Sequence, residues 1–295
     1  MILNDLYKLG YAHPPKWLLS NCSYLTIMGS NAYGVSAESS DIDIYGFCIP
    51  PKEIIFPHLG GIIQGFGSQG DKFEQYQEHH IKNPDKGIEY DFTIFNIVKY
   101  FDLCMDNNPN ALDSIFTPRR CVLHTTNISE YVRENRKLFL NKRSYARFRG
   151  YAYSQLTKIR NKVNSSNPKR QEDIQKNGMD TKFAYHVIRL ALEAEQILAT
   201  HDIDLERDKE IMKSVRRGEW TFDRLETWFQ DKEKTLEELY VKSSLRDIPD
   251  EEVIKKILLE CLSIHYGDLS TAIKHDVPVE KLLNDLQSII DRYRR

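Results

Sequence analysis

The stretch MGSNAYGVSAESSDIDIYGF, residues 28–47, decides which fold the chain can adopt. Asp41 and Asp43 alternate in it with Ile42 and Ile44. Alternation of period two is typical of a β-strand, so the two carboxylates lie on one face and the two isoleucines on the other. Two like charges on one face of a strand repel each other. We therefore expect a cation between the two aspartates.

A tight turn precedes these carboxylates. Residues 24–28 are apolar and β-rich, and they end at Gly29 and Ser30. Glycine lets the backbone approach a ligand closely, and N–H groups at a strand-to-helix turn bind phosphate oxygens. The Ser30 hydroxyl can donate a further hydrogen bond to such an oxygen. The turn is therefore predicted to bind phosphate groups.

A second alternating segment, residues 88–95, carries Glu89 and Asp91 on one face. Both residues have the same parity, so periodicity alone does not choose between them as the third acid. Aspartate freezes fewer rotatable bonds on binding a metal, which favours Asp91. Three carboxylates at one sheet edge are typical of an oxygen-ligand site for a pair of Mg²⁺ or Mn²⁺ ions. Such a pair can activate a 3′-hydroxyl and neutralise a leaving pyrophosphate.

The rest of the chain divides into two parts by its hydrophobic pattern. Of the 295 residues 41% are hydrophobic and 28% are charged, which is the balance of a globular protein. The strand patterns stop near residue 127, and helical spacing follows. We predict an α+β architecture with a catalytic domain over residues 1–127 and a helical domain over residues 128–295. The polar run 161–178 is predicted to be a loop. Helices are predicted at 96–105, 128–140, 143–163, 180–200, 206–217, 221–242, 250–264 and 277–293.

Charge is segregated along the chain although the net charge is only −2. Residues 133–170 contain twelve Lys or Arg and one acid, whereas residues 219–252 contain eleven acids and five bases. Aromatic residues are interleaved with the cations, a composition that suits base stacking and phosphate binding. The candidate nucleic-acid contacts are Lys142, Arg143, Arg147 and Arg149. The alternative is an amphipathic helix with a buried aromatic face, and the acidic run is then a solvated face or the partner of the basic helix.

Other sequence features indicate the cellular setting of the protein and the surroundings of several further side chains. Five widely spaced cysteines form no C-x-x-C pair, which favours reduced, buried thiols. No signal-like or membrane-spanning stretch is present, so we expect a cytoplasmic protein without a membrane partner. His79 and His80 are adjacent in an extended segment, so they should point to opposite faces and contact surface or substrate instead of a metal. Lys182 and His186 share a helix face behind an N-cap at Asp180.

The motif G-S-x-A-Y-G followed by S-D-x-D resembles the nucleotidyltransferase superfamily of DNA polymerase β. More narrowly, the chain resembles the RNA-repair-associated branch of that superfamily, which occurs in bacteria and phages. The matching blocks are GSNAYG (29–34), SDIDIYGF (40–47), DFTIFNIVKYF (91–101), NNPNALDSIFTP (107–118), GMDTKFAYHVIRL (178–190), RRGEW (216–220) and SSLRDIPD (243–250). The resemblance implies an N-terminal mixed sheet of the polymerase β type.

The resemblance also implies roles for individual residues. It makes Asp41, Asp43 and Asp91 the catalytic acids and ligands of Mg²⁺ or Mn²⁺. Nucleotide-binding residues are then those of the turn and motif, together with one helical lysine: Gly29, Ser30, Ser40 and Lys182. Residues 52–87 depart from the family pattern as an insertion, which bears on substrate choice.

The implied reaction transfers a nucleoside monophosphate from an NTP to a hydroxyl and releases pyrophosphate. The acceptor suggested by the resemblance and by the basic aromatic segment is a nucleic-acid 3′ end, such as that of an RNA or a tRNA. A protein hydroxyl, as in nucleotidylating toxins, is an alternative acceptor. A catalytically silent nucleotide-binding module is a third reading, and the presence of all three acids argues against it.

Overall fold

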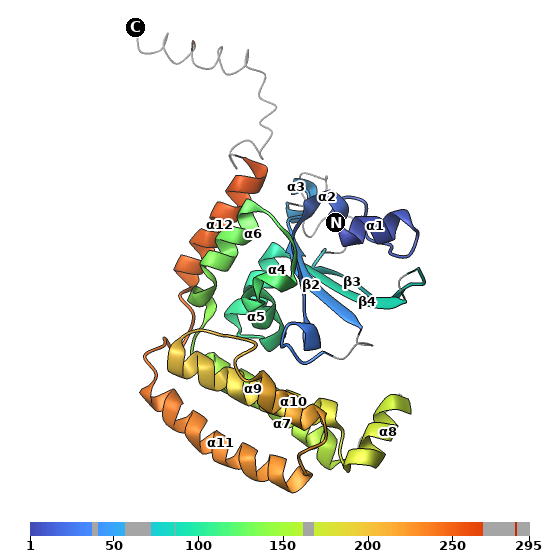
Figure 1. Ribbon diagram of the computed structural model, residues 1–295. Coiled ribbons are helices and arrows are strands. Elements are labelled where there is room, and N and C mark those ends of the chain that lie inside the picture. Colours follow the sequence, from blue (N-terminus) through green and yellow to red (C-terminus); the bar gives the residue numbers. More distant parts are fainter. Residues whose placement is uncertain (37–40, 57–71, 86, 162–167, 268–286, 288–295) are drawn as a thin grey trace.

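The computed structural model describes residues 1–36, 41–56, 72–85, 87–161, 168–267 and 287 (Figure 1). Two predictions lie outside the described residues: the nucleotide contact of Ser40 and, apart from Gln287, the helix at 277–293.

Five strands form one mixed sheet in the order β3-β4-β2-β1-β5. Strands β2 and β4 run parallel, and the other neighbouring pairs run antiparallel. Helices lie around this sheet and beside it, which confirms the α+β prediction (Figure 1). The strands are β1 (Cys22–Ile27), β2 (Ile42–Cys48), β3 (Gln75–Asn83), β4 (Ile88–Asn96) and β5 (Val122–Thr125).

The two faces of the sheet belong to two apolar cores, because successive side chains of a strand point to opposite faces. Ile44 and Phe92 are fully buried in the smaller core, which includes Leu3, Leu6 and Leu18 of the N-terminal helices. Phe47 and Phe95 belong to the larger core on the other face. Asp43 and Asp91 share the parity of these two phenylalanines. The two acids therefore lie on the face of the sheet that the larger core covers farther along.

Most helices lie on that second face or in a layer next to it. Helices α4 and α5 pack against the sheet, α7, α9, α10 and α11 form a separate layer, and α12 runs beside α4 and α6 (Figure 1). The α-helices are α1 (Ile2–Lys8), α2 (Leu18–Asn21), α3 (Lys52–Ile55), α4 (Ile97–Met105), α5 (Pro109–Phe116), α6 (Asn127–Glu134), α7 (Arg143–Arg160), α8 (Pro168–Asn177), α9 (Thr181–Thr200), α10 (Lys209–Arg216), α11 (Phe222–Lys242) and α12 (Glu251–Tyr266). Short 3-10 helices are η1 (Gly29–Asn31), η3 (Arg119–Cys121) and η4 (Arg136–Phe139).

The loop predicted over residues 161–178 is wrong in its second half, where α8 forms. The run is polar, but it consists largely of Lys, Arg, Gln and Glu, which are good helix formers. Asp173 also joins α8 to α9, because its carboxylate accepts hydrogen bonds from the backbone and the hydroxyl of Thr181, both at 2.8 Å. A helix without an apolar stripe of its own is thus held by its neighbour.

The predicted domain boundary at residue 127 falls at the start of α6. A capping box of Thr126 and Ser129 begins that helix, since each side chain bonds to the other's backbone N–H. The larger core extends across this point and includes Tyr24 on β1, Phe148 on α7 and Cys261 on α12. The two parts of the chain are therefore joined through shared apolar packing.

Two expectations about the whole chain can be compared with the structure. All five cysteines are buried and carry free thiols. Within the described ranges, no helix combines the length and the apolar character needed to cross a bilayer.

Candidate active site

The site is built on the parallel pairing of β2 with β4. In this register Asp43 lies directly opposite Asp91, with the pairs Ile42–Tyr90 and Ile44–Phe92 on either side. The side chain of Asp91 is 24% exposed, and Asp41 is exposed just before β2 begins. Acids and apolar residues alternate along both strands. The parallel register therefore places two of the predicted acids side by side on adjacent strands.

The Gly29–Ser30 turn lies against the Asp43 carboxylate. Gly29 has a φ of +64°, and a Cβ atom added to it would lie 2.4 Å from Asp43 Oδ2. The backbone N–H of Met28 donates to the Asp43 carbonyl at 2.8 Å. Only glycine combines this left-handed backbone with so close an approach. The predicted phosphate-binding turn and the predicted metal ligand are thus in direct contact.

The electrostatics of Asp43 indicate an excess of negative charge. Burial raises the pKa of Asp43, the charge of Asp91 raises it further, and Asp41 acts in the same direction. The ammonium of Lys182 lowers the pKa of Asp43, so this lysine lies close enough to affect its ionisation. Carboxylate oxygens are the ligands that hard divalent cations prefer, and a cation would relieve this repulsion. The residues present therefore fit a divalent metal ion.

Helix α9 directs Lys182 toward the acids. Asp180 caps the helix, as predicted, and its Oδ1 accepts hydrogen bonds from the backbone N–H groups of Lys182 at 2.9 Å and Phe183 at 3.0 Å. Lys182 is exposed in the first turn of the helix. The exposed ammonium and the positive end of the helix dipole together favour an anion at this place.

The prediction that His79 and His80 point to opposite faces is wrong. A bulge interrupts the pairing of β3 with β4 between Glu78 and Ile81, and His80 has a left-handed φ of 58°. His79 Nδ1 lies 3.5 Å from Asp91 Oδ1, and His80 Nδ1 lies 2.5 Å from Glu89 Oε1. The bulge thus turns both imidazoles toward the acids of β4.

The acids do not form one compact cluster. Across the described part of the chain, the potential ligand atoms that all lie within 4.8 Å of one another belong to His80, Glu89 and Asp91. Asp43 is next to this group through its pairing with Asp91, and Asp41 lies two residues before Asp43. The structure therefore brings Asp43 and Asp91 together and adds a histidine that the sequence pattern did not assign to the site.

Tyr45 extends the site beyond Asp43, on the same face of β2. Burial raises the pKa of this phenol, whereas the nearby side chains of Thr93 and Asn110 lower it. Tyr151 of α7 is close enough to act on the same phenol, and its own hydroxyl accepts a hydrogen bond from the amide of Asn108 at 3.2 Å. Sequence reasoning missed these residues, although the NNPN run at 107–110 was a signal for a capped turn.

A buried polar network holds the turn from the helical side. The Tyr33 hydroxyl donates to Asp113 Oδ2 at 2.6 Å and accepts a hydrogen bond from Arg189 Nη1 at 2.5 Å. Arg189 also forms an ion pair with Asp113 and lies 3.4 Å from Glu193. Burial raises the pKa of Glu193, the Asp113 carboxylate raises it further, and the Arg189 guanidinium lowers it. Tyr33 lies three residues after Ser30, so α5 and α9 fix the turn.

A second contact holds the same turn from outside. Arg120 donates a hydrogen bond to the carbonyl of Asn31 at 3.1 Å and pairs with Glu206 at 2.9 Å. Gly34 has a φ of +67°, and a Cβ atom there would lie 2.9 Å from the Glu206 carboxylate. The segment that follows Gly29 and Ser30 is therefore held both by the buried network and by the contacts of Arg120 and Glu206.

The basic segment lies mainly on α7 and is largely paired with acids. Arg149 contacts Glu233 of α11 at 2.6 Å, Lys142 lies 3.7 Å from Asp247, and Arg147 forms an ion pair with Asp106. Arg143 is exposed, and within the described ranges no carboxylate pairs with its guanidinium. Of the aromatic side chains in the segment, Phe148 is buried in the core, and Tyr145 and Tyr153 pack on α11. The acidic run is thus a partner of the basic helix.

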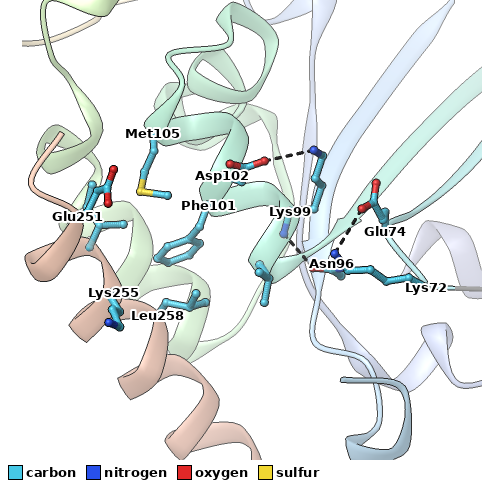
Figure 2. A pocket seen from close by; sticks show the side chains of 12 residues that line it. Lys72, Glu74, Asn96, Lys99, Phe101, Asp102, Met105, Glu251, Lys255 and Leu258 are labelled. Atoms are coloured by element: carbon cyan, nitrogen blue, oxygen red, sulfur yellow. Dashed lines mark hydrogen bonds and ion pairs between the residues drawn. The ribbon is translucent and has the colours of Figure 1, made fainter. Parts of the chain in front are cut away.

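A separate hollow of about 390 Å³ lies between α4 and α12. Figure 2 shows Phe101 and Met105 of α4 facing Leu258 and Glu251 of α12. It begins at Asn96, which is five residues and roughly 16 Å along β4 from Asp91. This hollow is therefore distinct from the acid-bearing site.

Comparison with known proteins places these features in a family. A model of the "RNA repair pathway DNA polymerase beta family" (RlaP) matches residues 16–248. An uncharacterized 38.9 kDa protein from the nrdC-mobD intergenic region of Enterobacteria phage T4 is 26% identical over 134 residues, which are 44% of this chain and 36% of that protein. The match thus spans little more than a third of the length of this relative.

A crystal structure of a nucleotidyltransferase-like protein from Exiguobacterium sibiricum aligns with 99% of this chain and 89% of its own. The two chains share 11% sequence identity, and the TM-score of their alignment is 0.27. The family match alone covers most of the sequence, including the turn, both acid-bearing strands and Lys182. The chain therefore belongs to the RNA repair pathway DNA polymerase beta family.

Proposed function

We propose that this protein is a nucleotidyltransferase that transfers a nucleoside monophosphate from an NTP to the 3′-hydroxyl of an RNA, with release of pyrophosphate. The observation that carries the proposal is the parallel register that sets Asp43 beside Asp91, with Gly29 against the Asp43 carboxylate. A metal-ligand pair in contact with a phosphate-binding turn is the arrangement that this reaction requires.

Gly29, Ser30 and Lys182 bind and orient the triphosphate. The turn offers backbone N–H groups and a hydroxyl, and its attachment to Tyr33 and Arg120 keeps these donors in place. Lys182 offers a positive charge near Asp43. Ser40, which precedes Asp41 in the motif, is proposed as a further phosphate contact. Fixed donors of this kind lower the entropic cost of bringing the reacting atoms into line.

In the proposed step the acceptor hydroxyl oxygen attacks the α-phosphorus of the NTP. The bond from this phosphorus to the bridging oxygen of the β-phosphate breaks, and its electron pair leaves with pyrophosphate. The Asp91 carboxylate accepts the hydroxyl proton. Mg²⁺ or Mn²⁺ ions bound by Asp41, Asp43 and Asp91 would supply the positive charge that stabilises the leaving group and favours ionisation of the attacking hydroxyl.

The family description supports RNA as the acceptor, since it refers to RNA repair. Lys142, Arg143, Arg147 and Arg149 are proposed to contact the backbone of this RNA. Arg143 is exposed without a carboxylate partner in the described part of the chain, whereas the other three would exchange an acid for a phosphate. Replacing a carboxylate partner by a phosphate in this way favours the binding of a polyanion whose charge density exceeds that of the protein's own acids.

The test uses the full chain, each α-labelled NTP in turn and either Mg²⁺ or Mn²⁺, with separate pools of RNA, DNA and protein. We expect label to join the 3′ end of RNA, and periodate oxidation of the RNA end to abolish the reaction. Label on protein would move the acceptor to a protein hydroxyl and overturn the RNA assignment. Absence of transfer to every pool, with NTP still bound, would favour a silent nucleotide-binding module.

A further inference from the structure

The bulge in β3 places a nitrogen ligand beside the acids of β4. In a regular strand, neighbouring side chains point to opposite faces, so one of two adjacent histidines would face away. Here the register shifts between Glu78 and Ile81, and the left-handed φ of 58° at His80 redirects its side chain. Histidine adopts this backbone region more readily than most residues other than glycine.

The contacts of His80 converge on two carboxylates. Its backbone N–H donates to Asp91 Oδ1 at 2.7 Å, and its ring Nδ1 lies 2.5 Å from Glu89 Oε1. Potential ligand atoms of His80, Glu89 and Asp91 all lie within 4.8 Å of one another. A metal ion placed among them would therefore meet one imidazole nitrogen and two carboxylate oxygens from two neighbouring strands.

The surrounding charges favour an additional cation at this place. Asp43 lies opposite Asp91 in the parallel register, and Asp41 lies two residues before Asp43. The side chain of His80 is 78% exposed, so an ion can reach the group from solvent without a change in the core.

We infer that His80, Glu89 and Asp91 form a metal position with one nitrogen ligand, adjoining the all-oxygen position of Asp41, Asp43 and Asp91, and that the nitrogen-containing position selects Mn²⁺ over Mg²⁺. The inference rests on the proposed function, since it extends the metal site of the same reaction. Mg²⁺ prefers oxygen ligands and keeps its waters, whereas imidazole suits first-row transition metals. Asp91 is shared by both positions, so the ion at His80 lies at the reaction centre.

The test is direct metal titration of the full chain without NTP. Free Mn²⁺ is measured by electron paramagnetic resonance, and Mg²⁺ is measured by its competition with bound Mn²⁺. We expect the wild type to bind Mn²⁺ more tightly than Mg²⁺. His80→Asn tolerates the left-handed backbone and replaces nitrogen by an amide oxygen, so it should lose at least about tenfold in Mn²⁺ affinity. Its affinity for Mg²⁺ should stay within about twofold of the wild type.

A matched control is available at His13, whose ring lies 3.0 Å from Glu78 and is exposed in the same manner. His13→Asn removes an exposed histidine–carboxylate pair outside the metal ligands and should leave both affinities unchanged. Equal Mn²⁺ to Mg²⁺ affinity ratios in the wild type and His80→Asn would overturn the inference. Because the titration contains no NTP, failure of nucleotidyl transfer would count against the proposed function and leave this result intact.

Discussion

Gly29 and Asp43 depend on each other at the centre of the site. A Cβ atom at Gly29 would lie 2.4 Å from Asp43 Oδ2, and the φ of +64° disfavours any other residue. The Asp43 carboxylate can therefore occupy its position beside Asp91 only if residue 29 has no side chain. This contact links the turn proposed to bind phosphate to the carboxylate proposed to bind metal.

Gly29→Ala is expected to lower kcat at least about tenfold, because a carboxylate displaced by less than an ångström loses its alignment with the metal. It should also lose about 1 kcal/mol of stability from the strained backbone. The matched control is Gly10→Ala, which has a φ of +74° and no heavy atom within 4 Å of the added Cβ. The control should lose stability and keep its turnover, and an equal loss of turnover in both variants would contradict the contact argument.

The buried network of Tyr33, Asp113, Arg189 and Glu193 acts at the scale of elements, because it joins the turn after β1 to α5 and α9. One arginine and two acids are enclosed together, and burial raises the pKa of Glu193 well above the usual range of glutamate. The folded state therefore binds a proton that the unfolded chain releases at neutral pH.

The sign of this linkage gives a pH-dependent prediction. Since the pKa is higher in the folded state, the stability contributed by protonated Glu193 is full below its unfolded pKa and falls as the pH rises toward the folded pKa. Glu193→Gln has no proton to lose, so its stability relative to the wild type should increase between about pH 5 and about pH 8. Urea unfolding across this range tests the prediction, with Glu238→Gln on the exposed end of α11 as the control. A constant difference would show that Glu193 is ionised in the fold.

Sequence patterns were sufficient for elements whose residues follow a clear strand or helix period. The alternation over 88–95 and the spacing over 180–200 correspond to β4 and α9 in the structure. Strand β3 was predicted only as an extended segment around His79 and His80, because QYQEHHIKN has little apolar alternation and lies at the sheet edge, where backbone pairing with β4 holds it. Helix α8 was missed for a similar reason, since it has no apolar stripe and is held through Asp173.

The candidate site likewise contains some contacts that the sequence could predict and others that it could not. Asp43 and Asp91 could be predicted, because local alternation and a parallel register suffice to place them side by side. The approach of Tyr151 to Tyr45 could not be predicted, since it depends on how α7 packs against the sheet. The approach of His80 to Glu89 depends on a bulge and a left-handed residue that no periodicity reports.

The whole molecule combines an acid-bearing sheet with a helical layer whose charges are paired. Helix α7 presents its cations to the acids of α11, and the larger core runs through both parts of the chain. The cations proposed to bind RNA are therefore also part of the packing between helices. Their two roles can be separated by salt dependence, because ion pairs within the protein do not release counterions from RNA.

Arg143→Ala is expected to reduce the slope of log affinity for single-stranded RNA against log salt by about 0.7, the value for one lost phosphate contact. Joint replacement of Lys142, Arg143, Arg147 and Arg149 should reduce it further and also lower thermal stability, since three of these residues pair with acids. Lys234→Ala on α11, which breaks an exposed pair with Asp231, is the control and should leave the slope unchanged. Unchanged slopes in all variants would place RNA on another surface.

The most direct test of the account is the rate of nucleotidyl transfer at saturating NTP and Mg²⁺ in Asp43→Asn and Asp91→Asn. The control is Asp231→Asn, an exposed acid of α11 that pairs with Lys234. Removing either ligand should cost several kcal/mol of transition-state stabilisation, so both variants should fall below about a hundredth of the wild-type rate while the control keeps its rate. Folding of each variant is checked by thermal denaturation. Retention of more than about a tenth of the wild-type rate in both variants would contradict the assignment of Asp43 and Asp91 as the catalytic pair.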